Sequence, residues 1–232
     1  TLGTGCSVLM NTGSAKAPSA NGLVTTVCWS AKEELSYALE GIIVSCGATV
    51  EWLKNELGLL TDSRESEAMA RSVNDNNGVY IVPAFSGLGA PHWQMSRKAA
   101  IYGLGFDCNK NHIVRAALES IAYQIKDVTG AMEAESGIKL KELMVNGGIT
   151  SNRFVLQFLA DLLECPIVHG GQPDVSARGA AWLAGLHAGI YKNLHELSHL
   201  NPRRTIVTPQ SNRRGMMSEF YEGWRGVMGY EL

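Results

Sequence analysis

The sequence predicts a mixed α/β fold with one central sheet flanked by helices. Three observations lead to this prediction. Strand-like runs fill the first 40 residues, helical periodicity dominates from residue 41 onward, and short apolar runs recur between the later helices. Strands followed by alternating helices and strands are typical of one sheet covered by helices. A chain of 232 residues is long enough to bury the core of one large domain.

The N-terminal third is predicted to be β structure, with turn residues between its strands. We expect strands over residues 4–11, 22–30 and 35–40. From residue 41 apolar residues recur at helical spacing, which predicts a helix that Gly58 ends. A short polar helix is expected over residues 65–73, and the run Asp75-Asn76-Asn77-Gly78 then marks a turn.

The rest of the chain alternates short strands with helices. We expect strands over residues 79–82, 99–104, 143–145 and 166–168, and helices over 113–135, 153–163, 177–188, 191–199 and 211–228. The helix over 113–135 has the clearest apolar stripe, and Gly137 is placed to end it. The loop from Pro83 to Trp93 is too apolar to be disordered, so we expect it to be ordered.

Composition and charge exclude several classes of protein. The net charge of −2 gives no electrostatic reason to expect nucleic acid as a partner, and no apolar run approaches the roughly 20 residues of a membrane span. The five cysteines are scattered without a CxxC pair, which favours reduced thiols over a disulfide framework or a zinc site. We therefore expect a cytoplasmic enzyme. Because the sequence starts without Met and directly at a motif, we expect it to be part of a longer protein.

Two glycine motifs indicate a ligand site. In the run Val145-Asn146-Gly147-Gly148-Ile149-Thr150-Ser151-Asn152, a strand end meets paired glycines that leave room for a flat ligand against the backbone. The N-terminus of the following helix is expected to offer unpaired N–H groups. Gly3-Thr4-Gly5 predicts a nest of N–H groups with a hydroxyl able to reach a phosphate oxygen. Taken alone, each motif is also compatible with an ordinary turn; neither is a Walker A loop or a dinucleotide fingerprint.

Longer stretches resemble a known family. The C-terminal signature of the FGGY carbohydrate kinases is matched at every constrained position by Ala99-Ala100-Ile101-Tyr102-Gly103-Leu104 and, seven residues later, by His112-Ile113-Val114-Arg115-Ala116-Ala117-Leu118-Glu119. Three stretches resemble the glycerol kinase branch of this family. They are Gly3-Thr4-Gly5-Cys6 with Met10-Asn11-Thr12-Gly13, the 83–93 loop, and Leu118-Glu119-Ser120-Ile121-Ala122-Tyr123-Gln124. The likeness runs from Gly3 to about Tyr191.

The resemblance implies a fold, ligands and a partner. The fold would be the actin-like, ribonuclease H-type fold, in which two domains close on ATP. Residues 1–232 would be the nucleotide-binding C-terminal domain, and the protein's own N-terminal domain would be its partner. The parent enzyme would phosphorylate glycerol, or a similar polyol, to glycerol 3-phosphate, using ATP and a Mg²⁺ ion held together with the N-terminal domain. Self-association into a homo-oligomer is left open.

The resemblance also assigns site residues. Thr4 matches the phosphate-contacting Thr of the family, while Gly47, Gly148 and Asn152 match positions that line the ADP site. Glu51 stands there too, where glycerol kinases usually have Gln. The catalytic Asp of the family lies just upstream of the Gly-Thr-Gly turn, before the first residue of this sequence. We therefore expect no catalytic residue in this chain, no metal site within it, and no catalysis by it alone.

Further departures from the family pattern leave alternatives open. Asn146 replaces the Asp of an Asp-Gly-Gly motif, and Arg178 replaces a Leu. Ser7 stands at a substrate position, where the family has an aromatic residue that packs on glycerol, and this departure leaves the choice of substrate open. With Glu51, these changes are compatible with a kinase for another polyol or sugar, or with a weakened paralogue. A non-catalytic assembly module on the same fold is a further alternative.

One competing motif indicates a different chemistry. His195-Glu196-Leu197-Ser198-His199 matches the HExxH pattern, which on a helix places two imidazoles on one face for Zn²⁺ and a Glu beside them as general base. No third ligand is evident in the sequence. A solvated surface helix is the simpler interpretation.

Overall fold

The computed structural model describes residues 1–31, 34–170, 174–200 and 204–229. Its strands are β1 (Cys6–Gly13), β2 (Val24–Ala31), β3 (Glu34–Ile43), β4 (Tyr80–Val82), β5 (Ala100–Tyr102), β6 (Leu143–Val145), β7 (Ile167–His169) and β8 (Thr205–Val207). Its helices are α1 (Gly47–Asn55), α2 (Ser66–Arg71), α3 (Lys110–Ser136), α4 (Arg153–Leu163), α5 (Val175–His187), α6 (Leu194–His199) and α7 (Arg214–Met228), with short 3₁₀ turns at Ser63–Glu65, Gly148–Ser151 and Ser211–Arg213.

The strands are divided among separate sheets rather than gathered in the one central sheet expected. In the described part of the chain, β1, β3 and β2 form an antiparallel sheet in that order, and β4 pairs with β5. A mixed sheet has the order β6-β7-β8, with β6 parallel and β8 antiparallel to β7. The α/β class and the flanking helices are as predicted.

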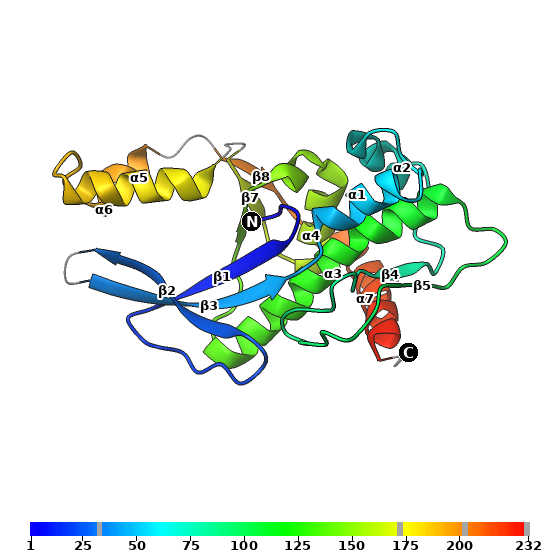
Figure 1. Cartoon of the computed structure of the whole chain (residues 1–232), viewed down its shortest axis with the longest axis horizontal. Coiled ribbons are helices and arrows are strands. Elements are labelled where there is room, and N and C mark those ends of the chain that lie inside the picture. Colours follow the sequence, from blue (N-terminus) through cyan, green and yellow to red (C-terminus); the bar gives the residue numbers. More distant parts are fainter. Residues whose placement is uncertain (32–33, 171–173, 201–203, 230–232) are drawn as a thin grey trace.

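Helix α3 is the centre of the molecule (Figure 1). It contacts β1, β3, β4, α1, α2 and α4, and its residues from Val114 to Ile125 are all buried. As expected, Gly137 ends this helix, in the left-handed conformation with a φ of 69°. Because this one helix touches the β1–β3–β2 sheet as well as α1, α2 and α4, it holds these elements in fixed positions around it.

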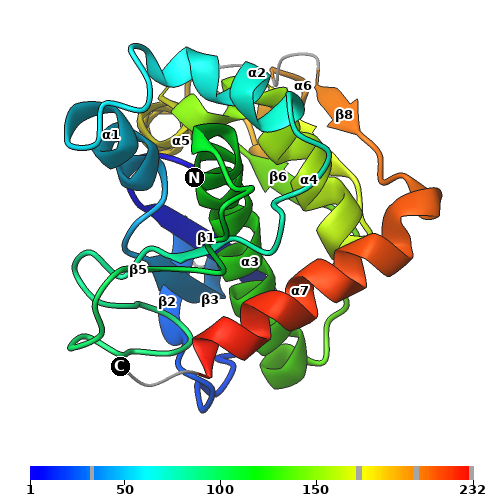
Figure 2. The same cartoon turned by 90° about the vertical axis from the view of Figure 1, so that its right-hand side faces the viewer.

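Helix α7 crosses α3 on the side away from β1 and β3 (Figure 2). Trp224 of α7 is fully buried, and its ring stacks on that of Tyr123 at a centroid distance of 5.4 Å. Asp127 of α3 accepts hydrogen bonds from Tyr221 (2.6 Å) and from the Trp224 indole (2.9 Å). Its carboxylate also lies 3.1 Å from His92 Nε2, so it joins α7 and the 83–93 loop to the core.

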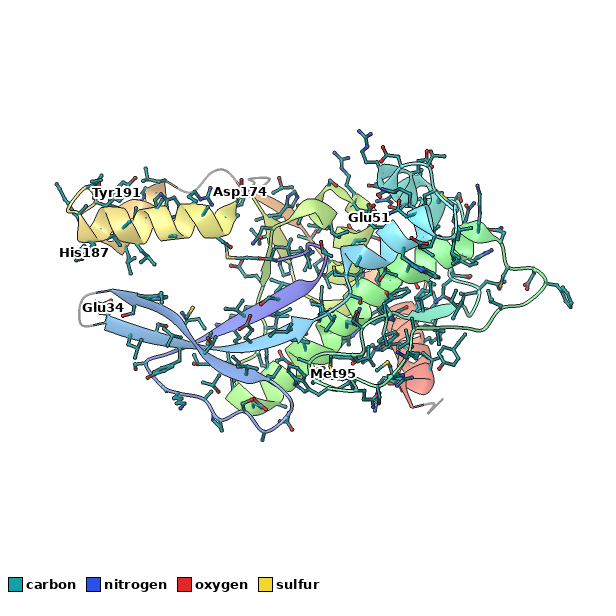
Figure 3. All side chains as sticks on the ribbon, in the orientation of Figure 1. Glu34, Glu51, Met95, Asp174, His187 and Tyr191 are labelled. Atoms are coloured by element: carbon teal, nitrogen blue, oxygen red, sulfur yellow. The ribbon has the colours of Figure 1, made fainter. Side chains whose placement is uncertain are left out.

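Helices α5 and α6 form an arm that projects from the body, alongside the end of the β2–β3 hairpin (Figure 1). Gly185 is the one buried residue of α5 among those described. Tyr191 folds back on α5 (Figure 3), and a Cβ at Gly185 would lie 2.6 Å from its ring.

Two departures from the predicted elements share one cause. Ile42 and Ile43, expected in a helix, belong to β3 because they pair with Ser7 and Cys6 of β1. Helix α1 starts only at Gly47. Strand β8 was not expected at all, and it forms by pairing with β7. In both places pairing with a distant segment overrides the local pattern.

Candidate functional site

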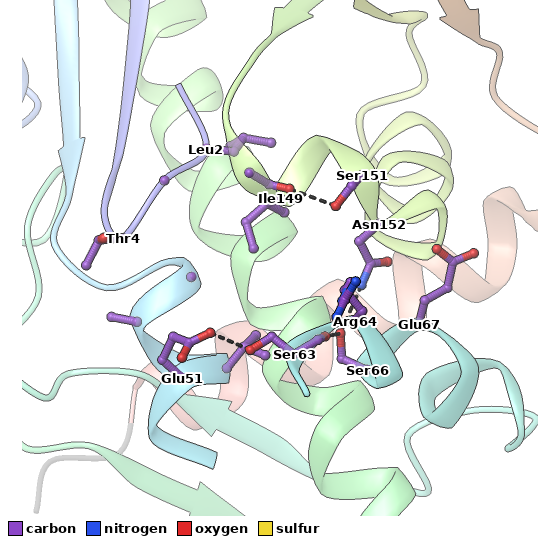
Figure 4. A pocket seen from close by; sticks show the side chains of 15 residues that line it. Leu2, Thr4, Glu51, Ser63, Arg64, Ser66, Glu67, Ile149, Ser151 and Asn152 are labelled. Carbon is purple, nitrogen blue, oxygen red and sulfur yellow. Dashed lines mark hydrogen bonds between the residues drawn. The ribbon is translucent and has the colours of Figure 1, made fainter. Parts of the chain in front are cut away.

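A cavity of about 710 Å³ opens between the N-terminal turn, α1, α2 and the Gly148–Ser151 turn (Figure 4). All five residues assigned to the nucleotide site line it: Thr4, Gly47, Glu51, Gly148 and Asn152. The remaining lining residues are Leu2, Gly3, Ala48, Val50, Ser63, Arg64, Ser66, Glu67, Ile149 and Ser151. A cavity of this size is within the range of small-molecule sites.

The Gly3-Thr4-Gly5 turn is fastened to the start of α1. The Gly3 carbonyl accepts from Gly47 N–H (2.9 Å), and the Thr4 carbonyl accepts from the N–H groups of Cys46 (2.9 Å) and Ala48 (3.1 Å). A Cβ at Gly47 would lie 2.7 Å from the Gly3 oxygen, so only glycine fits there. The carbonyls of the turn therefore cap α1, while the Thr4 side chain is exposed at the cavity.

The paired glycines have different surroundings. Gly147 has a φ of 103°, and a Cβ on it would lie 2.4 Å from the Leu2 oxygen. Gly148 has no such neighbour within 4 Å. Gly147 is therefore required by the backbone, whereas the bare face of Gly148 borders the cavity and leaves room for a ligand there.

The start of α4 is capped by protein groups, which corrects the expectation of free N–H groups at this helix. Asn152 Oδ1 accepts from Val155 N–H at 3.1 Å, and Glu67 accepts from Arg153 N–H at 2.8 Å. Asn152 Nδ2 donates to Ser66 Oγ at 3.2 Å. Asn152 thus holds α4 and α2 together in the cavity wall, and one of its amide hydrogens remains available.

Glu51 brings a negative charge to the cavity. Hydrogen bonds from Lys54, at 2.5 Å, and from the Ser63 hydroxyl hold the pKa of this carboxyl below its ordinary value. Glu51 is therefore ionised at neutral pH, and Lys54 balances its charge.

Four lining residues of the 3₁₀ turn and α2 were not singled out from the sequence: Ser63, Arg64, Ser66 and Glu67. The sequence indicated only a short polar helix there. Their one sequence signal is a polar run with the capping residue Asp62, whose carboxylate accepts from Arg64 N–H at 2.9 Å.

Ser7 does not line this cavity. It lies on β1 and donates its hydroxyl to Glu40 of β3 at 2.6 Å. Its neighbour Leu9, two residues along the same strand, is 52% exposed. Ser7 therefore belongs to a partly open sheet face rather than to the nucleotide cavity.

The HExxH motif lies on the short helix α6, so its two histidines are on one face of a helix. The rings of His195 and His199 are in contact, with centroids 4.7 Å apart, and Glu196 accepts from Lys192 N–H at 2.7 Å. Over the residues that the structure describes, no group of three His, Cys, Asp or Glu side chains is arranged to hold a metal ion. The geometry gives the zinc hypothesis no support. Nor is any helix of the described ranges long and apolar enough to cross a membrane.

Residues 1–188 match the model of the FGGY family of carbohydrate kinases, C-terminal domain. The chain belongs to this family. It is 47% identical over 228 residues to a glycerol kinase of Shewanella oneidensis and 50% identical over 225 residues to one of Psychromonas ingrahamii. These alignments cover 98% and 97% of the chain, but only 46% and 44% of the relatives. The chain thus spans about half the length of the curated relatives it matches.

Solved structures agree with this assignment. The Plasmodium falciparum glycerol kinase with ADP superposes with a TM-score of 0.88 at 33% identity, over 99% of this chain and 46% of that one. A Lactobacillus acidophilus xylulose kinase superposes with a TM-score of 0.85 at 18% identity, covering 97% of this chain and 45% of that one. At this low identity the likeness supports the fold alone. The fold is the actin-like ATPase fold of these kinases, as the sequence predicted.

Proposed function

We propose that the protein to which this chain belongs is an ATP-dependent glycerol kinase, which converts glycerol to glycerol 3-phosphate in the cytoplasm. Residues 1–232 would be its nucleotide-binding domain. The observation that carries the proposal is the convergence of Thr4, Gly47, Glu51, Gly148 and Asn152, which are spread over about 150 residues, on one cavity. The names of the relatives, at 46–50% identity, support the choice of glycerol.

In this proposal the cavity binds ATP and ADP with the phosphates near Thr4. The Gly-Thr-Gly turn is held rigid by its bonds to α1, and the exposed Thr4 hydroxyl is free to donate to a phosphate oxygen. The nucleoside would lie against the bare face of Gly148. Phosphoryl transfer depends mainly on positioning and electrostatic stabilisation, and a preorganised turn supplies both.

The other half of the reaction would come from the protein's own N-terminal domain, which would bind the polyol and close over the nucleotide. The catalytic Asp would precede Thr1, so residues 1–232 alone would bind nucleotide without turning it over. Mg²⁺ would be held by the phosphates of the nucleotide together with the N-terminal domain, and it would supply charge neutralisation there. Among the described residues, no group of three His, Cys, Asp or Glu side chains is arranged to hold a metal ion.

Substrate choice is the open part of the proposal. Ser7 offers no aromatic wall, which favours a larger or more hydroxylated polyol as the second candidate if this sheet face borders the substrate. The test is a coupled ADP-release assay on the full-length enzyme with ATP and either glycerol, a four-carbon polyol or a five-carbon polyol. We expect glycerol to give the highest kcat/KM. If none of the three polyols supports ADP release from ATP, the kinase assignment is wrong. A higher kcat/KM for a longer polyol would contradict the choice of glycerol as the substrate.

A further inference from the structure

One wall of the cavity is a short unit in which the 3₁₀ turn Ser63–Glu65 passes directly into α2. At six residues, α2 is too short to keep its place by its own helical bonds. The near end of the unit supplies four of the fifteen residues that line the cavity, which are Ser63, Arg64, Ser66 and Glu67 (Figure 4). Helix α4 holds this near end through the hydrogen bonds of Ser66 and Glu67. The far end, residues 68–71, does not line the cavity and needs a different support.

Arg115 of α3 holds the far end of α2 without lining the cavity itself. Its Nη1 donates to the carbonyl of Val73 at 2.7 Å and to that of Ala70 at 3.3 Å. Both carbonyls lie at the C-terminus of α2, where a helix leaves its last carbonyls without a partner inside the helix. Arg115 therefore caps α2 and joins it to α3 at the same time.

Buried groups fix the orientation of Arg115. Its side chain is 3% exposed, and its Nε donates at 2.7 Å to Glu119, whose side chain has no exposed surface. The other oxygen of Glu119 accepts from Asn76 at 3.0 Å and from Tyr123 at 3.1 Å. The guanidinium also lies over the ring of Phe154 in α4, 5.1 Å from its centroid. The far end of α2 is thus fixed relative to both α3 and α4.

We propose that Arg115 is a positioning residue for nucleotide binding, because it holds the far end of α2 and so keeps the near end in the cavity wall. The proposal rests on the nucleotide-binding role proposed above. Without these hydrogen bonds α2 is attached mainly at its first turn, about which it can pivot. The binding-competent position is then occupied for only part of the time, and the apparent Kd for the nucleotide rises in inverse proportion to that fraction.

The test removes the charges of Arg115 and Glu119 together. Loss of Arg115 alone would leave a buried, unpaired carboxylate and destabilise the whole fold, whereas Arg115→Met combined with Glu119→Gln leaves none. The new amide can still accept from Asn76 and Tyr123, and the new thioether side chain can still pack on Phe154. In the full-length enzyme we expect the Kd for ADP, measured by calorimetry, and the KM for ATP to rise about tenfold, as they would if α2 were in place about a tenth of the time. The KM for glycerol should stay at its parent value.

A second variant and a matched control separate positioning from general stability. Arg115→Lys keeps the charge beside Glu119 but lacks the planar fork that reaches this carboxylate and the α2 carbonyls together, so it should also weaken ADP binding even if the double variant fails to fold. The control is Asp161→Asn with Arg213→Met, which neutralises another pair with a fully buried carboxylate, 2.8 Å apart and outside the cavity. It should bind ADP as the parent does, and thermal melts compare the stability of all variants.

Each result decides the question. A parent-like Kd for ADP in the folded Arg115 variants would overturn the positioning role and leave the nucleotide site standing. An equal loss of ADP affinity in the control would overturn it too, since the effect would then follow from lower stability alone. Failure of the unmodified enzyme to bind ADP would overturn the nucleotide-binding role as well. Hydrogen exchange gives an independent readout: without ADP, residues 63–71 should exchange faster in Arg115→Lys than in the parent, and α7 should not.

Discussion

Replacing Gly148 by Leu should abolish nucleotide binding and leave the fold intact. A Cβ at Gly148 meets no protein atom within 4 Å, so the new side chain enters open space at the wall of the cavity and clashes with no neighbour at its Cβ. We therefore expect the free energy of unfolding to change by less than about 1 kcal/mol. Because the Leu side chain fills the space where a flat ligand would lie, ADP affinity should fall at least a hundredfold, which is about 2.8 kcal/mol.

The adjacent glycine is the matched control. Gly147→Ala places a Cβ 2.4 Å from the Leu2 oxygen, at a φ of 103°. That strain should lower the free energy of unfolding by about 2–4 kcal/mol, and the melting temperature by roughly 5–15 °C. The assays are calorimetric ADP titration and thermal melting. Undiminished ADP binding by Gly148→Leu would refute the placement of the ligand, and a Gly147→Ala variant as stable as the parent would refute the geometry of the turn.

Three further predictions follow from the same geometry. Thr4→Ala in the full-length enzyme should lower kcat/KM by the equivalent of about 1–3 kcal/mol, measured by ADP release; an unchanged rate would leave Thr4 a structural role only. Ser7→Phe in the full-length enzyme should raise glycerol turnover relative to larger polyols by about tenfold, and an unchanged preference would mean that Ser7 does not face the substrate. Burial raises the pKa of Cys6 to about 11 and that of Cys46 to about 12, so iodoacetamide at pH 8 should modify the partly exposed Cys28 and Cys108 before either of these buried thiols. Mass spectrometry identifies the modified thiol, and early labelling of Cys46 would contradict the packing around α1.

Local signals in the sequence predicted much of the fold. The apolar stripe and the terminal glycine of α3 placed that helix within three residues at its start and one at its end. Helix α4 was placed at its observed bounds, because Asn152 is a strong N-cap and the stripe that follows is regular. The start of α1 was misplaced, because Ile42 and Ile43 fit a helical stripe equally well and only their pairing with β1 decides.

The residues of the candidate site could be predicted where a local motif marks them, and not where only a long-range contact places them. Thr4 and Gly148 stand in contiguous glycine motifs, so the sequence itself marks them. Gly47 and Glu51 stand in no such motif and were assigned from the family resemblance.

Glu67 was predicted in neither way, because it enters the cavity wall by capping α4 at Arg153, 86 residues away in the chain. No pattern within one segment records such a contact. The same holds for Ser63, which is identified only by its hydrogen bond to Glu51.

The triple hydrogen-bonding role of Asp127 has a consequence for biosynthesis. Its donors Tyr221 and Trp224 belong to α7, which leaves the ribosome after every other described element. Until then, Tyr123 and the Asp127 carboxylate on α3 have no cover from α7, and His92 is the one group already made among the three side chains that contact this carboxylate. A nascent chain that stops before residue 214 therefore presents an aromatic surface next to an incompletely bonded carboxylate. Such products should be bound by chaperones or degraded, although all the residues of the nucleotide cavity have already been made.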